Sequence, residues 1–233
     1  MRWLAEQTAV WGLTLSDEQL DQFAVYQRLL LAWNERMNLT AVRQPNEIQE
    51  RHFLDSLTCA TVTGDLGGCT LIDVGTGAGF PGMPLKILFP KMQLVLVDSV
   101  AKKTQFLQAV AAELGLAGVQ IVAERGEVLG QSAAHRERYD WVVARGVATL
   151  RVLVEYLLPL ARVGGHVLAQ KGSGVEEEVA AAQTAVHTLG GAAAEIYPVQ
   201  LLHREHYLVK VAKVRATPGV YPRRVGVPGK RPL

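Results

Sequence analysis

The residues with the clearest capacity for chemistry form a glycine-rich segment between an apolar run and a helix-like stretch. Asp73 stands two positions before Gly75, and Gly77 and Gly79 follow at every second position. Glycine reaches backbone conformations closed to other residues, so this spacing favours a tight turn whose backbone lies close to a ligand. Residues 71–82 therefore predict a strand, a ligand-binding turn and a helix start, the opening unit of a nucleotide-binding α/β fold.

The order of the glycines separates two cofactor classes. A dinucleotide loop requires G-x-G-x-x-G, which would place a glycine where this chain has Phe80. The pattern present, D-x-G-x-G-x-G, resembles the S-adenosylmethionine (SAM) loop of class I methyltransferases. Phe80 itself suits either a ligand contact or a core position under the following helix. A glycine-rich turn without a ligand is the alternative for the whole segment.

Further apolar runs also end in charged residues or glycine. The run at 94–98 ends in Asp98, which is placed to accept both hydroxyls of an adenosine ribose or to cap the next helix. The other strand ends carry Glu124, Arg125, Gly126, Glu127, Arg145, Lys171 and Gly172. Ligands bind outside the carboxyl ends of parallel strands, so we expect one polar site there. The cations of this site would bind a carboxylate or a phosphate group. The backbone near Gly126 would hydrogen-bond the edge of the adenine.

The hydrophobic pattern predicts helices followed by a doubly wound α/β sheet. A capping box at Ser16 opens a helix to about Arg36, and another helix follows Pro45. Strands are expected at about 69–74, 94–98, 119–123, 141–144, 166–169, 193–199 and 206–214. Helices are expected at about 83–89, 102–114, 127–136, 150–158 and 175–189, with a turn at 163–165.

The last two predicted strands have no helix between them and should pair as an antiparallel hairpin. The fold class is therefore α/β, with a seven-stranded, mostly parallel Rossmann-like sheet and an N-terminal α-helical cap. We expect a helical cap at 1–62, a SAM-binding domain at 63–215 and a basic tail at 216–233.

Composition narrows the class of protein and its partners. An apolar fraction of 49% with 20% charged residues is ordinary for a packed protein. No uncharged apolar run is long enough to span a membrane, and the two cysteines form no metal pattern, which favours a reducing cytoplasm. From residue 200 onward there are eight basic residues and one acidic residue, against sixteen and twenty-one elsewhere. Such a basic segment suits a polyanion such as RNA, or is simply a solvated tail.

Several kinds of chemistry lack their motifs. There is no Walker A sequence and no G-x-S-x-G elbow, and neither cysteine follows proline as cytosine-C5 methylation would require. No Asn/Asp-Pro-Pro-aromatic motif occurs, which disfavours methylation of exocyclic amines. His203 and His206 stand three apart without an acidic or cysteine partner, so no metal site is expected.

The chain closely resembles the bacterial small-subunit (16S) ribosomal RNA methyltransferase G family, also called glucose-inhibited division protein B. The resemblance covers nearly the whole length. It rests on Asn38–Thr40, Arg51–Leu57, Asp73–Gly82, Asp98-Ser99 with Lys102-Lys103 and Phe106-Leu107, Ala144–Ala148, Gln170–Gly172 and Tyr221–Leu233. One departure is Gly146, where the family usually has alanine.

This resemblance implies methylation of N7 of a guanine in 16S rRNA, with SAM as the donor and the small ribosomal subunit or its RNA as the partner. N7 presents an in-plane lone pair, so no proton has to be removed before attack. The expected cofactor contacts are Asp73, Gly75, Gly77, Gly79, Phe80, Asp98, Ser99, Val100, Gly126, Glu127 and Arg145. The expected catalytic or RNA-side residues are Asn38, His52, Lys102, Arg125 and Arg145, with Lys171, Arg223 and Arg224 binding the substrate.

Two other functions fit parts of the pattern. A nicotinamide-dependent oxidoreductase shares the sheet and the acidic end of the second strand, but Phe80 and the terminal hairpin argue against it. A non-catalytic RNA-binding or assembly factor could keep a degenerate form of the same fold. The intact Asp73, Gly75 and Asp98 argue against degeneration.

Overall fold

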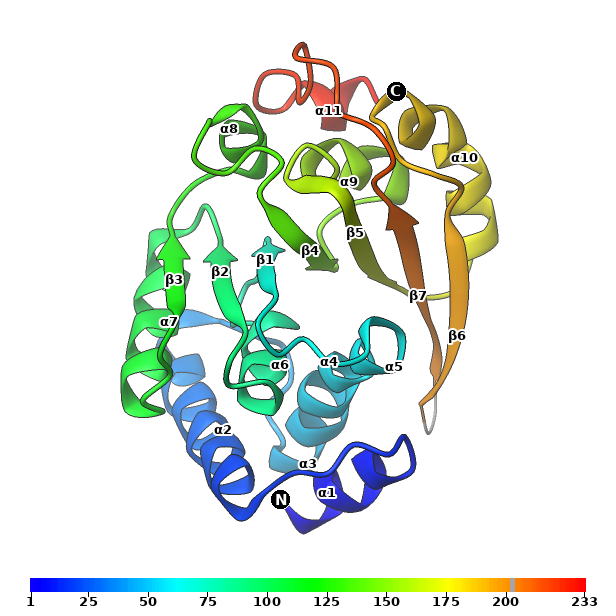
Figure 1. Ribbon diagram of the computed structural model, residues 1–233. Helices are drawn as coiled ribbons and strands as arrows, with labels where there is room; N and C mark the ends of the chain where they lie inside the picture. Colours follow the sequence, from blue (N-terminus) through cyan, green and yellow to red (C-terminus); the bar gives the residue numbers. More distant parts are fainter. Residues whose placement is uncertain (202–203) are drawn as a thin grey trace.

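A seven-stranded sheet forms the centre of the molecule (Figure 1). The computed structural model describes residues 1–201 and 204–233. The sheet order is β3 (Val119–Val122), β2 (Gln93–Val97), β1 (Thr70–Val74), β4 (Tyr139–Arg145), β5 (Ala161–Lys171), β7 (Arg204–Ala212) and β6 (Glu195–Leu201). Strands β1 to β5 are parallel, and β7 is antiparallel to both of its neighbours. The predicted α/β class and terminal hairpin are confirmed. His203 lies outside the described residues. The expectation that His203 and His206 form no metal site therefore stays a prediction.

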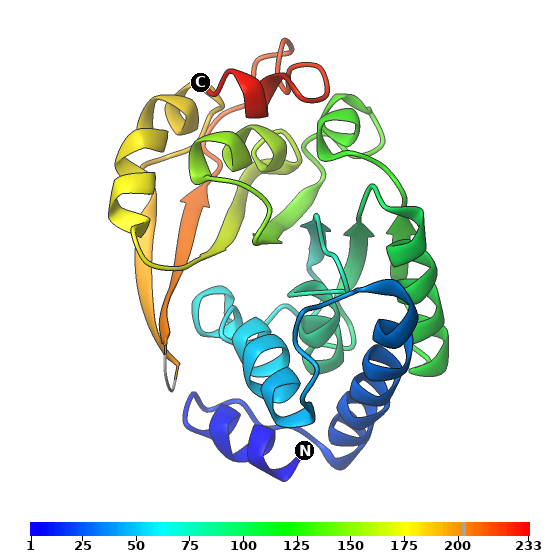
Figure 2. The same cartoon turned by 180° about the vertical axis from the view of Figure 1, so that it is seen from behind.

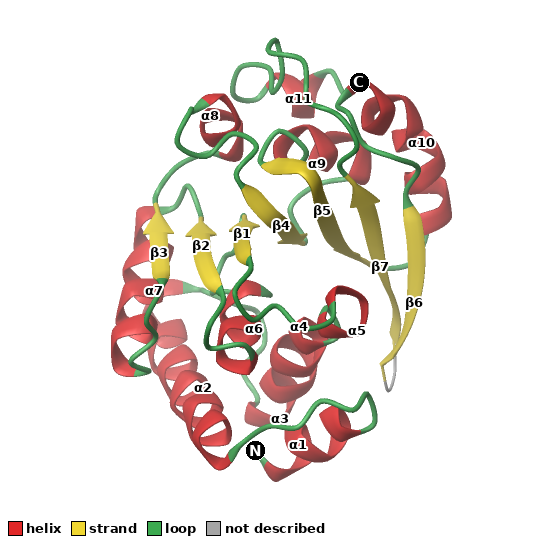
Figure 3. Ribbon diagram, viewed as in Figure 1, coloured by secondary structure: helices red, strands yellow, loops and turns green. Residues whose placement is uncertain are grey.

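Both faces of the sheet are covered by helices (Figure 3). In β1, Leu71 belongs to the core on one face and Ile72 to the core on the other. Consecutive side chains of a strand point to opposite faces, which is why the central strands read as continuous apolar runs. One face packs against α6 (Gly82–Leu88), α7 (Ala101–Glu113) and the N-terminal helices. The other packs against α8 (Gly126–Gln131), α9 (Leu150–Leu157) and α10 (Val175–Thr188).

The N-terminal helices are α1 (Arg2–Ala9), α2 (Asp17–Met37), α3 (Pro45–Ile48), the π-helix η1 (Gln49–Leu54), α4 (Asp55–Leu57) and α5 (Ala60–Thr63). The capping box is confirmed: the Ser16 hydroxyl accepts from the Gln19 N–H, and the Gln19 side chain accepts from the Ser16 N–H. Phe23 and Tyr26 of α2 are fully buried in the same core as one face of the sheet. The cap is therefore packed tightly against the strands that carry the glycine turn. The boundary at residue 62 stays a prediction.

Two expected element boundaries were wrong. The helix expected at 127–136 ends at Gln131, because Ser132 adopts an extended conformation. The turn expected at 163–165 lies inside β5, which begins at Ala161. A Cβ at Gly165 would lie 2.8 Å from the carbonyl oxygens of Tyr139 and Asp140, so this glycine permits close approach to β4.

The C-terminal residues 217–233 pack against α8 and α9 and end in the short helix α11 (Val227–Lys230). This C-terminal segment lies at the opposite end of the molecule from the helical cap (Figures 1 and 2). Within the described residues, no helix is long and apolar enough to cross a membrane.

Candidate active site

A cleft of about 260 Å³ opens at the carboxyl ends of β1 and β2. This glycine-loop cleft is lined by Val74, Gly75, Val97, Asp98, Ser99, Val100, Lys103, Glu124, Arg125, Gly126, Glu127, Gly146, Val147 and Tyr156. The lining comes from the loops after four strands, as expected for an open α/β sheet. The predicted gathering of charged strand ends at one edge is therefore observed on this side.

The glycine turn needs glycine for conformation as well as for space. Gly75, Gly77 and Gly79 have φ of +73°, +62° and +103°, a region that other residues rarely enter. A Cβ at Gly75 would lie only 2.6 Å from a methyl group of Val147, on the wall of the cleft. A side chain at position 75 would therefore be strained and would displace the Val147 side chain, and the bare backbone borders the cleft. Gly77 and Gly79 do not line it.

Asp73 supports the turn from beneath. Its Oδ2 accepts hydrogen bonds from the Thr76 hydroxyl at 2.7 Å and from the Gly82 N–H at 2.8 Å, and the side chain is fully buried. Burial raises the pKa of Asp73 to about 6, although the Thr76 and Gly82 hydrogen bonds oppose the shift. Asp73, predicted as a cofactor contact, thus holds the loop and lies outside the cleft lining.

Asp98 is one of three acidic residues that line the glycine-loop cleft, with Glu124 and Glu127. Its Oδ2 accepts from the Gly77 N–H at 3.0 Å and lies 3.5 Å from Lys103 Nζ, and its Oδ1 accepts from the Val100 N–H at 2.9 Å. The N-cap residue of α7 is Val100, without a side-chain cap, so Asp98 orders the turn before the helix. A carboxylate oxygen accepts two hydrogen bonds, so acceptor capacity remains for a ligand hydroxyl.

A second cleft, of about 690 Å³, lies on the other side of Arg145. This Arg145 cleft is lined by Val42, Arg51, His52, Asp55, Arg145, Gly146, Gln170, Lys171, Gly172, Ser173, Glu205 and His206. Gly146 lines both clefts. The two clefts are therefore adjacent after the end of β4, where they share this one lining residue.

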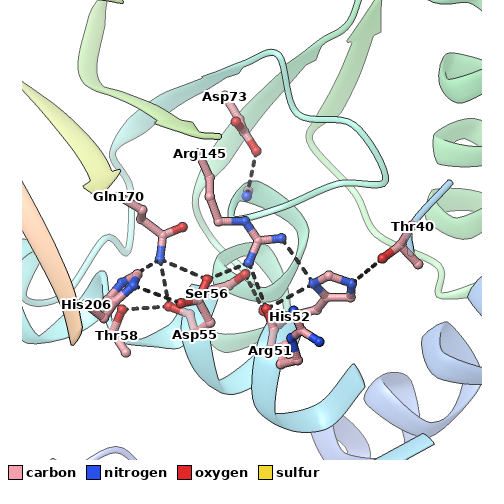
Figure 4. Close-up of polar contacts among 11 residues, drawn as sticks. Thr40, Arg51, His52, Asp55, Ser56, Thr58, Asp73, Arg145, Gln170 and His206 are labelled. Carbon is pink, nitrogen blue, oxygen red and sulfur yellow. Dashed lines mark hydrogen bonds and ion pairs between the residues drawn. The ribbon is translucent and has the colours of Figure 1, made fainter. Parts of the chain in front are cut away.

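Asp55 organises the floor of the Arg145 cleft (Figure 4). Its Oδ2 accepts from Arg145 Nη1 at 2.5 Å, and its Oδ1 lies 3.2 Å from His206 Nδ1. Gln170 Nε2 donates to the Asp55 carbonyl at 2.8 Å. Burial lowers the pKa of His206, with the neighbouring Asp55 charge opposing that shift. Both carboxylate oxygens are thus engaged, and Arg145 is held in one orientation.

His52 connects this floor to the glycine turn. Its Nε2 lies 2.7 Å from the Thr40 hydroxyl, and its Nδ1 lies 3.4 Å from Arg145 Nη2. Its ring stacks on Phe80 with centroids 4.6 Å apart, and the Arg145 guanidinium lies 4.9 Å from the Phe80 centroid. Phe80 is 4% exposed and also stacks on Tyr26, so it takes the core position that the sequence left open.

The remaining predicted residues divide between the clefts and the surface. His52, Arg145 and Lys171 line the Arg145 cleft, whereas Arg125 lines the glycine-loop cleft and is exposed. The other predicted residues line neither cleft: Asn38, the exposed left-handed C-cap of α2; Lys102, exposed on α7; Arg223, paired with Glu155; and Arg224, exposed. Lys171 Nζ binds the Ala148 carbonyl and Glu178, so its charge is already partly engaged.

Sequence reasoning missed four residues that the structure places at the clefts. Asp55 and Gln170 lie within the segments 51–57 and 170–172 that carry the resemblance, but only the fold reveals that they touch. His206 reaches the same floor from β7. Lys103, not its neighbour Lys102, contacts Asp98, because successive residues on a helix point in different directions.

The geometry of the glycine-loop cleft fits a methyl donor with a nucleoside. Bare backbone borders the cleft at position 75, and the Asp98 carboxylate lines it with acceptor capacity for a hydroxyl. The fold agrees with solved methyltransferases. A SAM-dependent O-methyltransferase from Thermotoga maritima has a TM-score of 0.57 at 14% identity, covering 81% of this chain and 72% of its own. TrmN from Thermus thermophilus has a TM-score of 0.55 at 16% identity, covering 71% and 53%. The protein has the fold of the class I SAM-dependent methyltransferases.

Its family is also defined by sequence. The family model described as rRNA small subunit methyltransferase G matches residues 19–207. The ribosomal RNA small subunit methyltransferase G of Roseiflexus castenholzii is 51% identical over 96% of this chain and 95% of its own. The protein of the same name from Alkaliphilus metalliredigens is 46% identical over 95% and 94%. The chain belongs to the rRNA small subunit methyltransferase G family.

Proposed function

We propose that this methyltransferase transfers a methyl group from SAM to N7 of a guanine in small-subunit ribosomal RNA, in the cytoplasm. The observation that carries the proposal is the meeting of the two clefts at Gly146. One cleft is lined by bare glycine backbone, carboxylates and cations, the groups that the donor requires. The other has about 690 Å³ of space and three cations in its lining, Arg51, Arg145 and Lys171, of which the last two are paired with carboxylates. This space and these cations suit a nucleotide.

On the donor side, the chain provides shape and orientation. When bound, SAM supplies an electrophilic methyl group on its sulfonium sulfur. Asp98 would accept hydrogen bonds from the ribose hydroxyls, and the backbone at Gly75 would border the chain of the methionine portion. Gly126 and Glu127 would form the wall beside the adenine. Arg125 and Lys103 are the cations of this cleft: Arg125 precedes Gly126 on the adenine side, and Lys103 lies 3.5 Å from Asp98 on the ribose side.

On the RNA side, Arg145 is the central group. Asp55 and the Arg51 carbonyl hold its guanidinium, so it is placed before any substrate arrives. Arg51 and His52 lie on one wall of the Arg145 cleft. Lys171, the last residue of β5, lines the same cleft from another element. We propose that these groups clamp the phosphate and base of the target nucleotide.

The proposed reaction asks for no general base. N7 of guanine attacks with its own lone pair, so alignment of the two reactants contributes most of the rate. This agrees with a floor whose carboxylate, Asp55, is fully engaged by Arg145 and His206.

The decisive experiment incubates the protein with labelled SAM and small subunits that lack the modification, then maps methylated positions by mass spectrometry. We expect one 7-methylguanine in the rRNA. Asp98→Ala, which removes the proposed ribose acceptor, should give none. If the protein binds the rRNA but transfers no labelled methyl group, the hypothesis of a non-catalytic assembly factor is favoured. A labelled methyl group on another atom or base would refute the N7 assignment.

A further inference from the structure

Glu155 of α9 is a fully buried carboxylate next to the glycine-loop cleft. Its neighbour in the chain, Tyr156, lines that cleft. A buried carboxylate is costly unless it is paired, and the partner here comes from the C-terminal segment. Arg223 donates from its backbone N–H at 2.9 Å and from Nε at 2.8 Å to one oxygen, and from Nη2 at 2.5 Å to the other.

The C-terminal segment makes further contacts with the wall of the cleft. The Gly226 N–H donates at 3.1 Å to Oε1 of Glu127, which is itself a lining residue and 6% exposed. A Cβ at Gly229 would lie 3.8 Å from the Tyr156 hydroxyl. Glu127, Glu155 and Tyr156 are thus all touched by residues 223–229.

The start of the segment is anchored separately. Arg136 donates to the Thr217 and Tyr221 carbonyls at 2.7 Å each, and Glu137 Oε1 accepts from the Thr217 N–H at 2.7 Å. Lys213, fully buried, lies 3.3 Å from the same Glu137 oxygen. Residues 217–222 are therefore fixed to the turn before β4, and they deliver Arg223 to Glu155.

We propose that Arg223 is a positioning residue for the methyl donor: it holds α9 through Glu155, while the Gly226–Glu127 hydrogen bond of the same segment holds α8, so that both helices form the adenine-side wall of the glycine-loop cleft. The inference rests on the assignment of that cleft to SAM. It separates two adjacent arginines that sequence reasoning grouped as RNA contacts. Arg223 is committed to an interior carboxylate, whereas Arg224 is exposed.

Linkage between sites is reciprocal, so the wild-type protein offers the first test. If the segment holds the wall, SAM must in turn stabilise the segment. Hydrogen exchange with and without SAM should show slower exchange in residues 223–229 as well as in α8. Protection confined to α8 and the glycine turn would overturn the proposal. Absence of any SAM binding would refute the cleft assignment instead.

Variants supply the second test. Arg223→Ala should raise the Kd for SAM on the order of tenfold, a typical coupling between linked sites, while Arg223→Lys recovers part of it. Because Arg223→Ala leaves a buried carboxylate unpaired, the double variant Glu155→Met/Arg223→Met is included. It removes both charges and should fold while still binding SAM weakly.

The matched control is Lys230→Ala, an exposed basic residue of the same segment, which should keep the wild-type Kd for SAM. RNA affinity separates positioning from substrate contact: Arg223→Lys should change the Kd for SAM more than the Kd for small-subunit rRNA. A folded Glu155→Met/Arg223→Met protein with wild-type SAM affinity would overturn the proposal. So would an Arg223→Lys variant that loses only RNA affinity.

Discussion

The imidazole of His52 stacks on the ring of Phe80, with centroids 4.6 Å apart and planes inclined by 19°. His52 belongs to the π-helix of the N-terminal cap, and Phe80 closes the glycine turn. The Arg145 guanidinium lies over the same phenyl ring. One buried aromatic ring therefore joins the cap, the turn and the end of β4, so the two clefts share a rigid support.

Tyr26 is expected to couple the helical cap to the glycine turn. Its hydroxyl donates to the Ala78 carbonyl, and both residues are buried. Tyr26→Phe leaves that carbonyl without its partner and should lower the free energy of unfolding by about 1–2 kcal/mol. Urea unfolding measures this loss, and calorimetry should show a weaker affinity for SAM. An unchanged affinity would show that the turn holds its shape without the cap.

Gly75→Val should abolish SAM binding. The Cβ would lie 2.6 Å from Val147, and the positive φ adds strain. Even Gly75→Ala should raise the Kd for SAM by at least about tenfold, a loss of about 1.4 kcal/mol in binding. The control is Gly115→Ala, with φ of +61° and open space around the new Cβ, which carries similar strain away from the cleft. Equal SAM affinity in the two alanine variants would contradict the role assigned to the turn.

Asp55→Ala should separate rate from donor affinity. Without Asp55, the half-buried Arg145 loses its ion pair, and the free energy of unfolding should fall by about 3 kcal/mol. We expect a large fall in methyl transfer at saturating SAM, with little change in the Kd for SAM. Glu113→Ala breaks the exposed pair with Arg28 and should change unfolding by less than about 0.5 kcal/mol. Wild-type turnover in Asp55→Ala would exclude Arg145 positioning as a requirement.

The buried Asp73 should make stability depend on pH. Burial raises its pKa from the ordinary 3.8 to about 6, so between these values the folded protein binds more protons than the unfolded chain. The contribution of Asp73 to stability therefore falls as the pH rises from about 4 to about 6, by up to about 3 kcal/mol, and stays low above that. Unfolding of wild type and Asp73→Asn should thus diverge as the pH rises through this window. Parallel curves from pH 4 to pH 7 would contradict the raised pKa.

The sequence predicted those parts of the fold and site that depend on neighbouring residues. The alternation of apolar runs predicted the sheet and its terminal hairpin, and the glycine spacing predicted the turn. The π-helix at Gln49–Leu54 was not predictable, because six residues do not distinguish its period from that of an α-helix. The contacts of Asp55 with His206 and Gln170 join segments more than a hundred residues apart, which no local pattern encodes.

The charge of the residues after position 200 also shows what the sequence alone could not predict. The sequence has eight basic residues after position 200, and this excess of positive charge suggested a polyanion partner. In the structure, Arg223 pairs with Glu155 and Lys213 lies beside Glu137, so part of that charge neutralises interior carboxylates. The charge available to RNA is smaller than the sequence count, and only the fold shows which residues carry it.

Gly146 has a consequence for how such an enzyme can diverge. It has φ of +65°, open space around its missing Cβ, and a place in the lining of both clefts. A larger side chain there would add bulk to both clefts at once, so one substitution at position 146 is expected to change donor and target affinity jointly. A substitution on a wall that belongs to the Arg145 cleft alone is expected to change target affinity alone.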